Sequence, residues 1–124
     1  MRKNVKCSYH TNRKMDDSVY NLRREVMAII YEMKKHVELP RIDIRITDTK
    51  RNVLGTARMG DNMIWIPADT VINNAHRMWE VVLHEILHAV KAIPHDVNCK
   101  LMSPTCGKGL SKLQAIKIFK TYYK

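Results

Sequence analysis

The residues best suited to chemistry in this 124-residue chain form the run His84-Glu85-Ile86-Leu87-His88. Residues four apart lie on the same face of a helix, so both imidazoles can reach one ion. Neutral imidazole suits Zn²⁺, and two imidazoles leave room for a third ligand and a water molecule. Glu85 would flank this ion without binding it, where a carboxylate can take a proton from water and later pass it to a leaving amine. The run therefore predicts the site of a zinc hydrolase.

A third ligand is expected shortly after the second histidine. His95 follows His88 after a gap of six residues, and a turn at Pro94 would bring it back over the helix to complete a three-histidine site. Asp96 is the fallback ligand, and Cys99 is a more distant one. No Asp or Glu follows Asp96 in the sequence, which excludes a glutamate ligand from a later helix. The sequence thus predicts a single zinc ion per chain.

Three helices are expected, and apolar residues at helical spacing define the face that each one buries. The first helix begins at a cap among Asp16, Asp17 and Ser18 and ends at Leu39-Pro40. The second helix carries the histidines and runs from Asn73 or Asn74 to about Ala92. The third helix runs from Ser111 to about Tyr122. The predicted buried residues are Val19, Leu22, Val26, Ile29, Ile30, Met33 and Val37 in the first helix, Trp79, Val82, Leu83, Ile86, Leu87 and Val90 in the second, and Leu113, Ile116 and Phe119 in the third.

Strands are expected before and after the first helix. Ile42, Ile44 and Ile46 alternate with polar residues, which is typical of a half-buried strand. Further candidates are Val5–Tyr9, Val53–Met59 and Met63–Ile66, and the last two are separated by the turn residues Gly60-Asp61-Asn62. Because Pro67 cannot donate to a ladder, we place the end of the strand Met63–Pro67 at a sheet edge.

The expected fold class is therefore α+β. A small mixed sheet of three to four strands packs on the N-terminal helix and on the zinc-binding helix, and a C-terminal helix completes a single domain over residues 1–124.

The run from His84 to Asp96, followed by Leu101-Met102-Ser103-Pro104, resembles the metzincin metallopeptidases. It is most similar to the matrixin-like members and has some similarity to archaemetzincins. The resemblance implies a metzincin-like fold, with His84, His88 and His95 as zinc ligands, Glu85 as the general base and Met102 in a "Met-turn" beneath the metal. It further implies that Gly55-Thr56-Ala57 and Ile64-Trp65-Ile66 correspond to the family's penultimate strand and its substrate-binding edge strand.

The spacing departs from the family pattern in one respect. That pattern has glycine three residues after the second histidine and the third histidine three residues later. Here Lys91 stands at the glycine position, and His95 comes one residue late. We therefore expect the helix to run further before the chain turns at Ile93-Pro94.

The expected function is that of a zinc-dependent endopeptidase. The edge strand Met63–Pro67 would hold an extended peptide or protein substrate by main-chain hydrogen bonds, with Met63, Ile64, Trp65 and Ile66 as binding residues. By the resemblance, Ser103 and Pro104, in the segment that runs to Cys106, would form the wall of the pocket beyond the scissile bond. Two alternatives stay open, namely a zinc-stabilised binding module that uses basic chain ends and a zinc amidase that acts on cell-wall peptide.

The charge distribution bears on possible partners. The net charge is +10, and the basic residues gather at the two ends, with five Lys/Arg in residues 1–14 and six Lys in residues 100–124. Such ends could attract nucleic acid, an anionic surface or acidic protein substrates. No nucleic-acid-binding motif accompanies them, and we expect solvated chain ends. Nothing in the sequence specifies an oligomeric state.

The sequence predicts a cytoplasmic or host-cytoplasmic protein, since no apolar run approaches the roughly 20 residues of a membrane span and no secretory signal is visible. Three cysteines, Cys7, Cys99 and Cys106, are an odd set, so we expect free thiols. There are two alternatives to free thiols. One is a second zinc site formed by the three cysteines and His10, and the other is a disulfide between Cys99 and Cys106.

Overall fold

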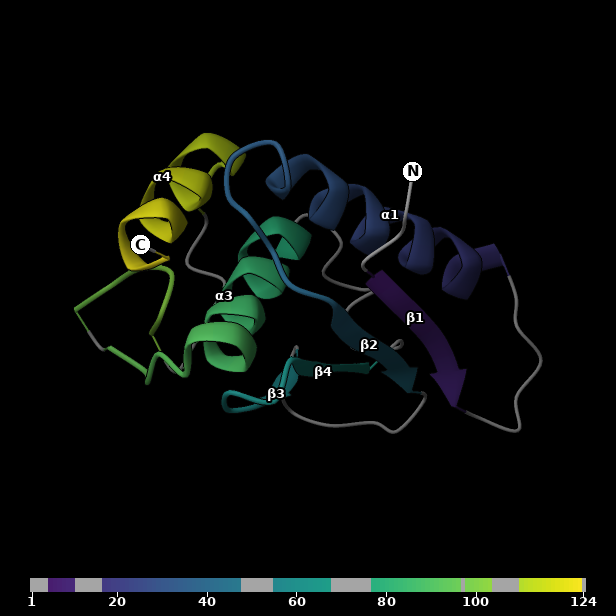
Figure 1. Ribbon diagram of the computed structural model, residues 1–124. Helices are drawn as coiled ribbons and strands as arrows, with labels where there is room; N and C mark the ends of the chain where they lie inside the picture. Colours follow the sequence, from purple (N-terminus) through teal and green to yellow (C-terminus); the bar gives the residue numbers. More distant parts are fainter. Residues whose placement is uncertain are drawn as a thin grey trace.

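The computed structural model describes residues 5–10, 17–47, 55–67, 77–96, 98–103 and 110–123 (Figure 1). Its elements follow in the order β1 (Val5–His10), α1 (Asp17–Met33), β2 (Ile42–Thr47), β3 (Thr56–Arg58), β4 (Met63–Pro67), α3 (Met78–Lys91) and α4 (Lys112–Tyr122). The predicted α+β class is confirmed. Within the described residues, no helix has the length and apolar character needed to cross a membrane.

The strands form one mixed sheet in the order β1-β2-β4-β3. Strands β1, β2 and β4 are parallel, with Val5 opposite Ile42 and Ile44 opposite Ile64, whereas β3 runs antiparallel to β4. The alternation in β2 is as predicted, because its three isoleucines are fully buried and the polar residues between them are half-buried. One face of the sheet therefore belongs to the core.

The prediction that Met63–Pro67 forms an edge strand is wrong. Strand β4 lies between β2 and β3, so the edge on this side of the sheet is β3. Strand β3 begins at Thr56, which lies opposite Trp65. Pro67 thus has a described ladder partner only in β2, at Thr47. Of the predicted strand Val53–Met59, residues 53 and 54 lie outside the described residues.

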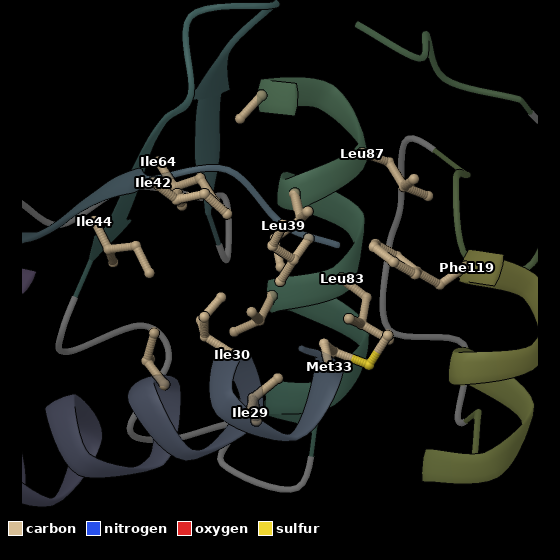
Figure 2. Close-up of a cluster of buried hydrophobic side chains, with 14 of the residues drawn as sticks. Ile29, Ile30, Met33, Leu39, Ile42, Ile44, Ile64, Leu83, Leu87 and Phe119 are labelled. Carbon is tan, nitrogen blue, oxygen red and sulfur yellow. The ribbon is translucent and has the colours of Figure 1, made fainter. Parts of the chain in front are cut away.

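The core lies between the sheet and the helices, and the described side chains of α1 that are buried in it are Val26, Ile29, Ile30 and Met33. Figure 2 labels the last three. The helix ends at Met33, earlier than predicted. Turns follow it, in which Lys34 donates its N–H to the Ile30 carbonyl and Val37 donates to the Met33 carbonyl. Val19 and Leu22 were predicted to be buried, but their side chains are not among those that the structure describes.

Helix α3 is buried on almost every side, whereas the sequence predicted a single buried face. Met78 and the whole run from Glu80 to Ala89 are buried, and Trp79 is only half-buried. The reason is that α3 packs against α1, the strands β3 and β4, and α4. A helix so enclosed must bury polar residues as well as apolar ones, and those polar residues include His84, Glu85 and His88. The predicted start of this helix, near residues 73 and 74, lies outside the described residues.

Helix α4 begins as predicted, at an N-cap that satisfies its first free backbone N–H groups. The Ser111 hydroxyl accepts from the Gln114 N–H, and the Gln114 side chain accepts from the Ser111 N–H. The buried residues are Ala115, Ile116 and Phe119. The prediction that Leu113 joins them is wrong, because Leu113 is 78% exposed. At about 100° per residue it lies roughly 160° around the helix axis from Ala115, so it falls outside the buried arc.

Replacing Phe119 with alanine tests the packing of α4. Phe119 is fully buried in the core cluster, so we expect Phe119→Ala to lower the free energy of unfolding by about 3–5 kcal/mol. The matched control is Leu113→Ala, which is expected to change it by less than about 0.5 kcal/mol. Denaturant unfolding followed by circular dichroism measures both values. Equal losses for the two variants would contradict the buried face described here.

Candidate metal centre

Three histidines come together at the C-terminal half of α3 and just beyond it. His84 and His88 are buried on the helix, and His95 is exposed on the segment that follows it. One potential ligand atom from each of the three lies within 4.8 Å of the other two. The ring centroids are separated by 4.6 Å for His84 and His88, 5.2 Å for His84 and His95, and 4.7 Å for His88 and His95. Among the described residues, this group could hold a metal ion.

Backbone carbonyls fix which nitrogen of each buried ring faces the centre. His84 Nδ1 lies 2.7 Å from the Leu101 carbonyl oxygen, and His88 Nδ1 lies 2.6 Å from the Ile93 carbonyl oxygen. A carbonyl oxygen only accepts hydrogen bonds, so each Nδ1 carries the proton and donates it. Each Nε2 is then left with a free lone pair.

The two Nε2 atoms face each other at a separation of 3.0 Å. With both protons committed to carbonyls, this contact brings two lone pairs together and is not an ordinary hydrogen bond. A cation held between the rings would satisfy both nitrogens at once. The donor set therefore fits a metal ion that accepts imidazole.

Burial also keeps these rings in the form that binds metal. It lowers the pKa of His84 to about 4 and lowers the pKa of His88 below its ordinary value, in both cases because the charged imidazolium loses water. Both rings are therefore neutral at pH 7, which is the protonation state of a histidine ligand.

The turn after α3 explains why His95 comes one residue late. The helix ends at Lys91, and Ala92 adopts a left-handed conformation with φ 53° and ψ 34°. Ala92 donates its N–H to the His88 carbonyl, and Ile93 donates to the Leu87 carbonyl. The left-handed residue is thus displaced by one position relative to Lys91, and His95 follows it by three residues. The helix does run further, as predicted, but the turn itself lies at Ala92.

The other candidate ligands lie outside the cluster. The Asp96 carboxylate accepts from the Asn98 N–H at 3.0 Å and from the Tyr122 hydroxyl at 3.1 Å, so both of its oxygens have partners. Cys99 is half-buried with a free thiol, and its sulfur accepts from the Met102 N–H at 3.4 Å.

Met102 is fully buried within the turn at residues 100–102, directly after the Leu101 carbonyl that holds His84. The Met102 carbonyl in turn accepts from the Asp96 N–H at 2.8 Å. This turn therefore contacts the site twice, once through His84 and once through the segment that carries His95.

Glu85 is 5% exposed, and its side chain lies against the start of β3. A Cβ atom added at Gly55 would lie 3.1 Å from Glu85 Cγ and 3.2 Å from its Oε2. Glycine therefore provides the space that this carboxyl group occupies. Burial raises the pKa of Glu85 to about 8, because removal from water disfavours the charged carboxylate. At this pKa the group is mainly protonated at pH 7, and a positive charge bound by the histidines would favour the carboxylate form that accepts a proton.

The edge strand β3 runs alongside the helix that carries the histidines. At its start, Gly55 lies beside Glu85, and the turn that follows the strand donates two backbone N–H groups to α3. Gly60 donates to the His88 carbonyl at 3.1 Å, and Asn62 donates to the Ala89 carbonyl at 3.0 Å. Among the described strands, β3 therefore forms the edge on this side of the sheet, and the turn after it is bonded to the part of α3 that carries His88.

The predicted substrate-binding residues of β4 are not at an exposed strand edge. Ile64 and Ile66 are buried on the core face of β4, while Met63 and Trp65 are half-buried and are paired with strands on both sides. These residues cannot form the expected exposed edge. Ser103 is buried, and Pro104 and Cys106 lie outside the described residues. The alternative second zinc site also depends on side chains outside them, those of Cys7, His10 and Cys106.

Sequence reasoning missed the groups that orient the site. The Leu101 and Ile93 carbonyls belong to the backbone, so no residue type signals them. The role of Gly55 beside Glu85 requires a contact between segments 30 positions apart. Only the glycine itself, inside the predicted strand Val53–Met59, was a usable signal.

No protein-family model matches the chain, and no curated protein is significantly similar to it.

Substitution at the turn after α3 tests the register of the helix end. Ala92→Gly is expected to raise the free energy of unfolding by about 1 kcal/mol, because alanine is strained in the left-handed region and glycine is not. Lys91→Gly, measured against Lys91→Ala, is expected to lower it by about 1 kcal/mol, because residue 91 is helical. Chemical denaturation of the four proteins measures both effects. Stabilisation by glycine at 91 and destabilisation at 92 would contradict this turn.

Proposed function

We propose that this protein is a zinc-dependent endopeptidase. The observation that carries the proposal is the convergence of His84, His88 and His95, with the Nε2 atoms of the first two only 3.0 Å apart and their Nδ1 atoms held by carbonyls. Tetrahedral zinc with Zn–N bonds of about 2.0–2.1 Å separates its nitrogen ligands by roughly 3.3 Å, close to that distance. Three neutral imidazoles also form a known catalytic zinc set that leaves one position open.

Glu85 is the residue that would move protons. When bound, zinc supplies a Lewis acid that polarises a carbonyl oxygen and makes water more acidic. Glu85 takes the proton that the attacking water loses and delivers it to the amine that leaves when the peptide bond breaks. Burial of Glu85 excludes bulk water from this carboxyl group, and Gly55 leaves room for it.

Strand β3 is the element suited to holding the substrate. Its pairing with β4 uses one edge, and its other edge has no strand partner within the described residues. An extended peptide can add to such an edge through main-chain hydrogen bonds. Gly55, just before β3, lies beside Glu85, and Gly60, just after it, is bonded to the His88 carbonyl, so a peptide on β3 would lie along the part of α3 that carries the site. The substrate role expected for Met63–Pro67 is thereby reassigned to Thr56–Arg58.

Membership of the metzincins is part of the proposal. It is supported by the order of ligands on α3 and the segment after it, and by a buried Met102 in a turn whose neighbouring carbonyl holds His84. The left-handed residue three positions before His95 further supports it, since the family pattern has glycine there.

Zinc stoichiometry tests the metal centre. We expect about one zinc ion per wild-type chain, measured by elemental analysis after dialysis. His84→Ala, His88→Ala and His95→Ala should each weaken zinc binding by more than about 100-fold, because losing a ligand costs more than losing a group that orients one. His36→Ala is the control, since His36 is exposed and lies outside the cluster. A wild-type protein that binds no added zinc would refute the proposal.

Removing the Glu85 carboxylate tests the mechanism. Glu85→Gln keeps the size of the side chain but cannot accept the proton, so hydrolysis of an unfolded protein substrate should fall by about 10²–10⁴-fold while zinc content is unchanged. Full activity in this variant would contradict the assigned role. Wild-type cleavage of peptidoglycan fragments alone would favour the amidase alternative, and zinc binding without hydrolysis of either substrate would favour a binding module.

A further inference from the structure

The three histidines of the proposed centre are held unequally. His84 and His88 are buried, and each ring is oriented by a carbonyl through Nδ1. His95 is exposed, and within the described residues its ring contacts the other two histidines but forms no hydrogen bond that would orient it. The position of His95 therefore depends on how its own backbone segment is fixed.

That segment is fixed through the next residue, Asp96. Its N–H donates to the Met102 carbonyl at 2.8 Å, which ties the backbone to the turn beside His84. Its side chain accepts from the Asn98 N–H at 3.0 Å and from the Tyr122 hydroxyl at 3.1 Å. The Asn98 contact is local. The Tyr122 contact spans 26 positions in the sequence and joins the segment to the last residue of α4.

Helix α4, which carries Tyr122, is itself fixed in the fold. It is capped at Ser111, and Phe119 is fully buried in the core. Just after the helix, Tyr123 stacks on Phe119 with ring centroids 5.1 Å apart and donates its hydroxyl to the Glu38 carbonyl at 2.9 Å. The end of α4 is thus held by the stacking on Phe119 and by the bond to Glu38. These two contacts also fix the backbone of Tyr122, which directly precedes Tyr123.

The chemistry of the contact suits a permanent link. Hydrogen bonding to Cys99, burial and hydrogen bonding to Asp96 raise the pKa of Tyr122 above its ordinary value. The hydroxyl therefore stays protonated and acts as a donor. A hydrogen bond from a neutral donor to a carboxylate is stronger than one between neutral groups.

We propose that Tyr122 is a positioning residue of the metal centre, which holds His95 in place through the carboxylate of Asp96. This inference rests on the proposed three-histidine metal site. It gives Asp96 a role different from the fallback ligand predicted from sequence, because both carboxylate oxygens are engaged by Asn98 and Tyr122. It also gives α4 a function at the site, although α4 supplies no member of the histidine cluster.

The test is the zinc affinity of Tyr122→Phe, measured in the full chain by competition with a chromophoric chelator. This variant removes one hydroxyl, and we expect the Kd for zinc to rise by about 10-fold, as for other groups that orient a metal ligand. The matched control is Tyr123→Phe, which removes the neighbouring hydroxyl and its bond to the Glu38 carbonyl. The Kd of Tyr123→Phe for zinc should stay within about twofold of wild type. This should hold even if the variant is less stable when its unfolding is measured with a chelator present.

A double-mutant comparison separates positioning from general stability. If Tyr122 acts through His95, then Tyr122→Phe should change the Kd no further once His95→Ala is present. Tyr122→Phe should likewise cause no further loss of affinity when Asp96→Ala is present, because Asp96→Ala removes the same hydrogen bond from the acceptor side. If Tyr122→Phe folds poorly, Asp96→Ala takes its place in the comparison. An equal loss of affinity in the presence and absence of His95 would overturn the proposal.

The outcomes also distinguish this inference from the proposed function. Normal zinc binding by Tyr122→Phe, in a protein whose wild type binds zinc through His84, His88 and His95, would overturn the role of Tyr122 alone. Absence of zinc binding by the wild type would overturn the metal centre and the role of Tyr122 together.

Discussion

The contact on which the site depends is the 3.0 Å approach of the His84 and His88 Nε2 atoms inside a buried helix. Two imidazoles one helical turn apart meet in this way only when each ring is held in a single tautomer and orientation. The Leu101 carbonyl does this for His84, and the Ile93 carbonyl does it for His88. Those two carbonyls in turn fix where the chain must pass after α3. The course of residues 93–96 and 98–101 is therefore part of the site and not simply a connection to α4.

The burial of α3 creates the need for this arrangement and the means to meet it. A helix packed against α1, the sheet and α4 has few surfaces on which polar side chains can reach water. Buried polar groups are costly unless they find partners, so the histidines require defined acceptors and Glu85 requires a space of its own. Gly55 provides that space by having no side chain. The apolar core in Figure 2 thus fixes the helix, and the helix fixes the geometry of its polar residues.

Local patterns in the sequence predicted the elements but not their neighbours. The alternation of Ile42, Ile44 and Ile46 identified β2, and the spacing of two histidines identified the face of α3 that carries them. Strand order is different, because it depends on pairing between distant segments. Nothing in the residues of β4 indicates that β3, which precedes it in the chain, takes the edge of the sheet. Leu113 was misplaced for a related reason, since an apolar residue type does not show which face of α4 its neighbours cover.

The candidate site divides in the same way between what the sequence predicts and what it cannot. His84, Glu85, His88 and His95 were identifiable because their residue types carry the chemistry. The groups that orient them are backbone carbonyls, a missing side chain and a tyrosine 26 positions beyond Asp96. No residue type or local spacing encodes such partners, because they are selected by tertiary contact.

The left-handed residue after α3 has a consequence for how such sites are compared between proteins. One added helical residue advances the exit point by about 1.5 Å and rotates it by roughly 100° around the axis. Here the left-handed residue lies directly after the helix end, at Ala92, and the chain brings His95 close to the other two histidines. A search for such sites by distance between side chains therefore finds this group, whereas a search with one fixed spacing along the sequence can miss it.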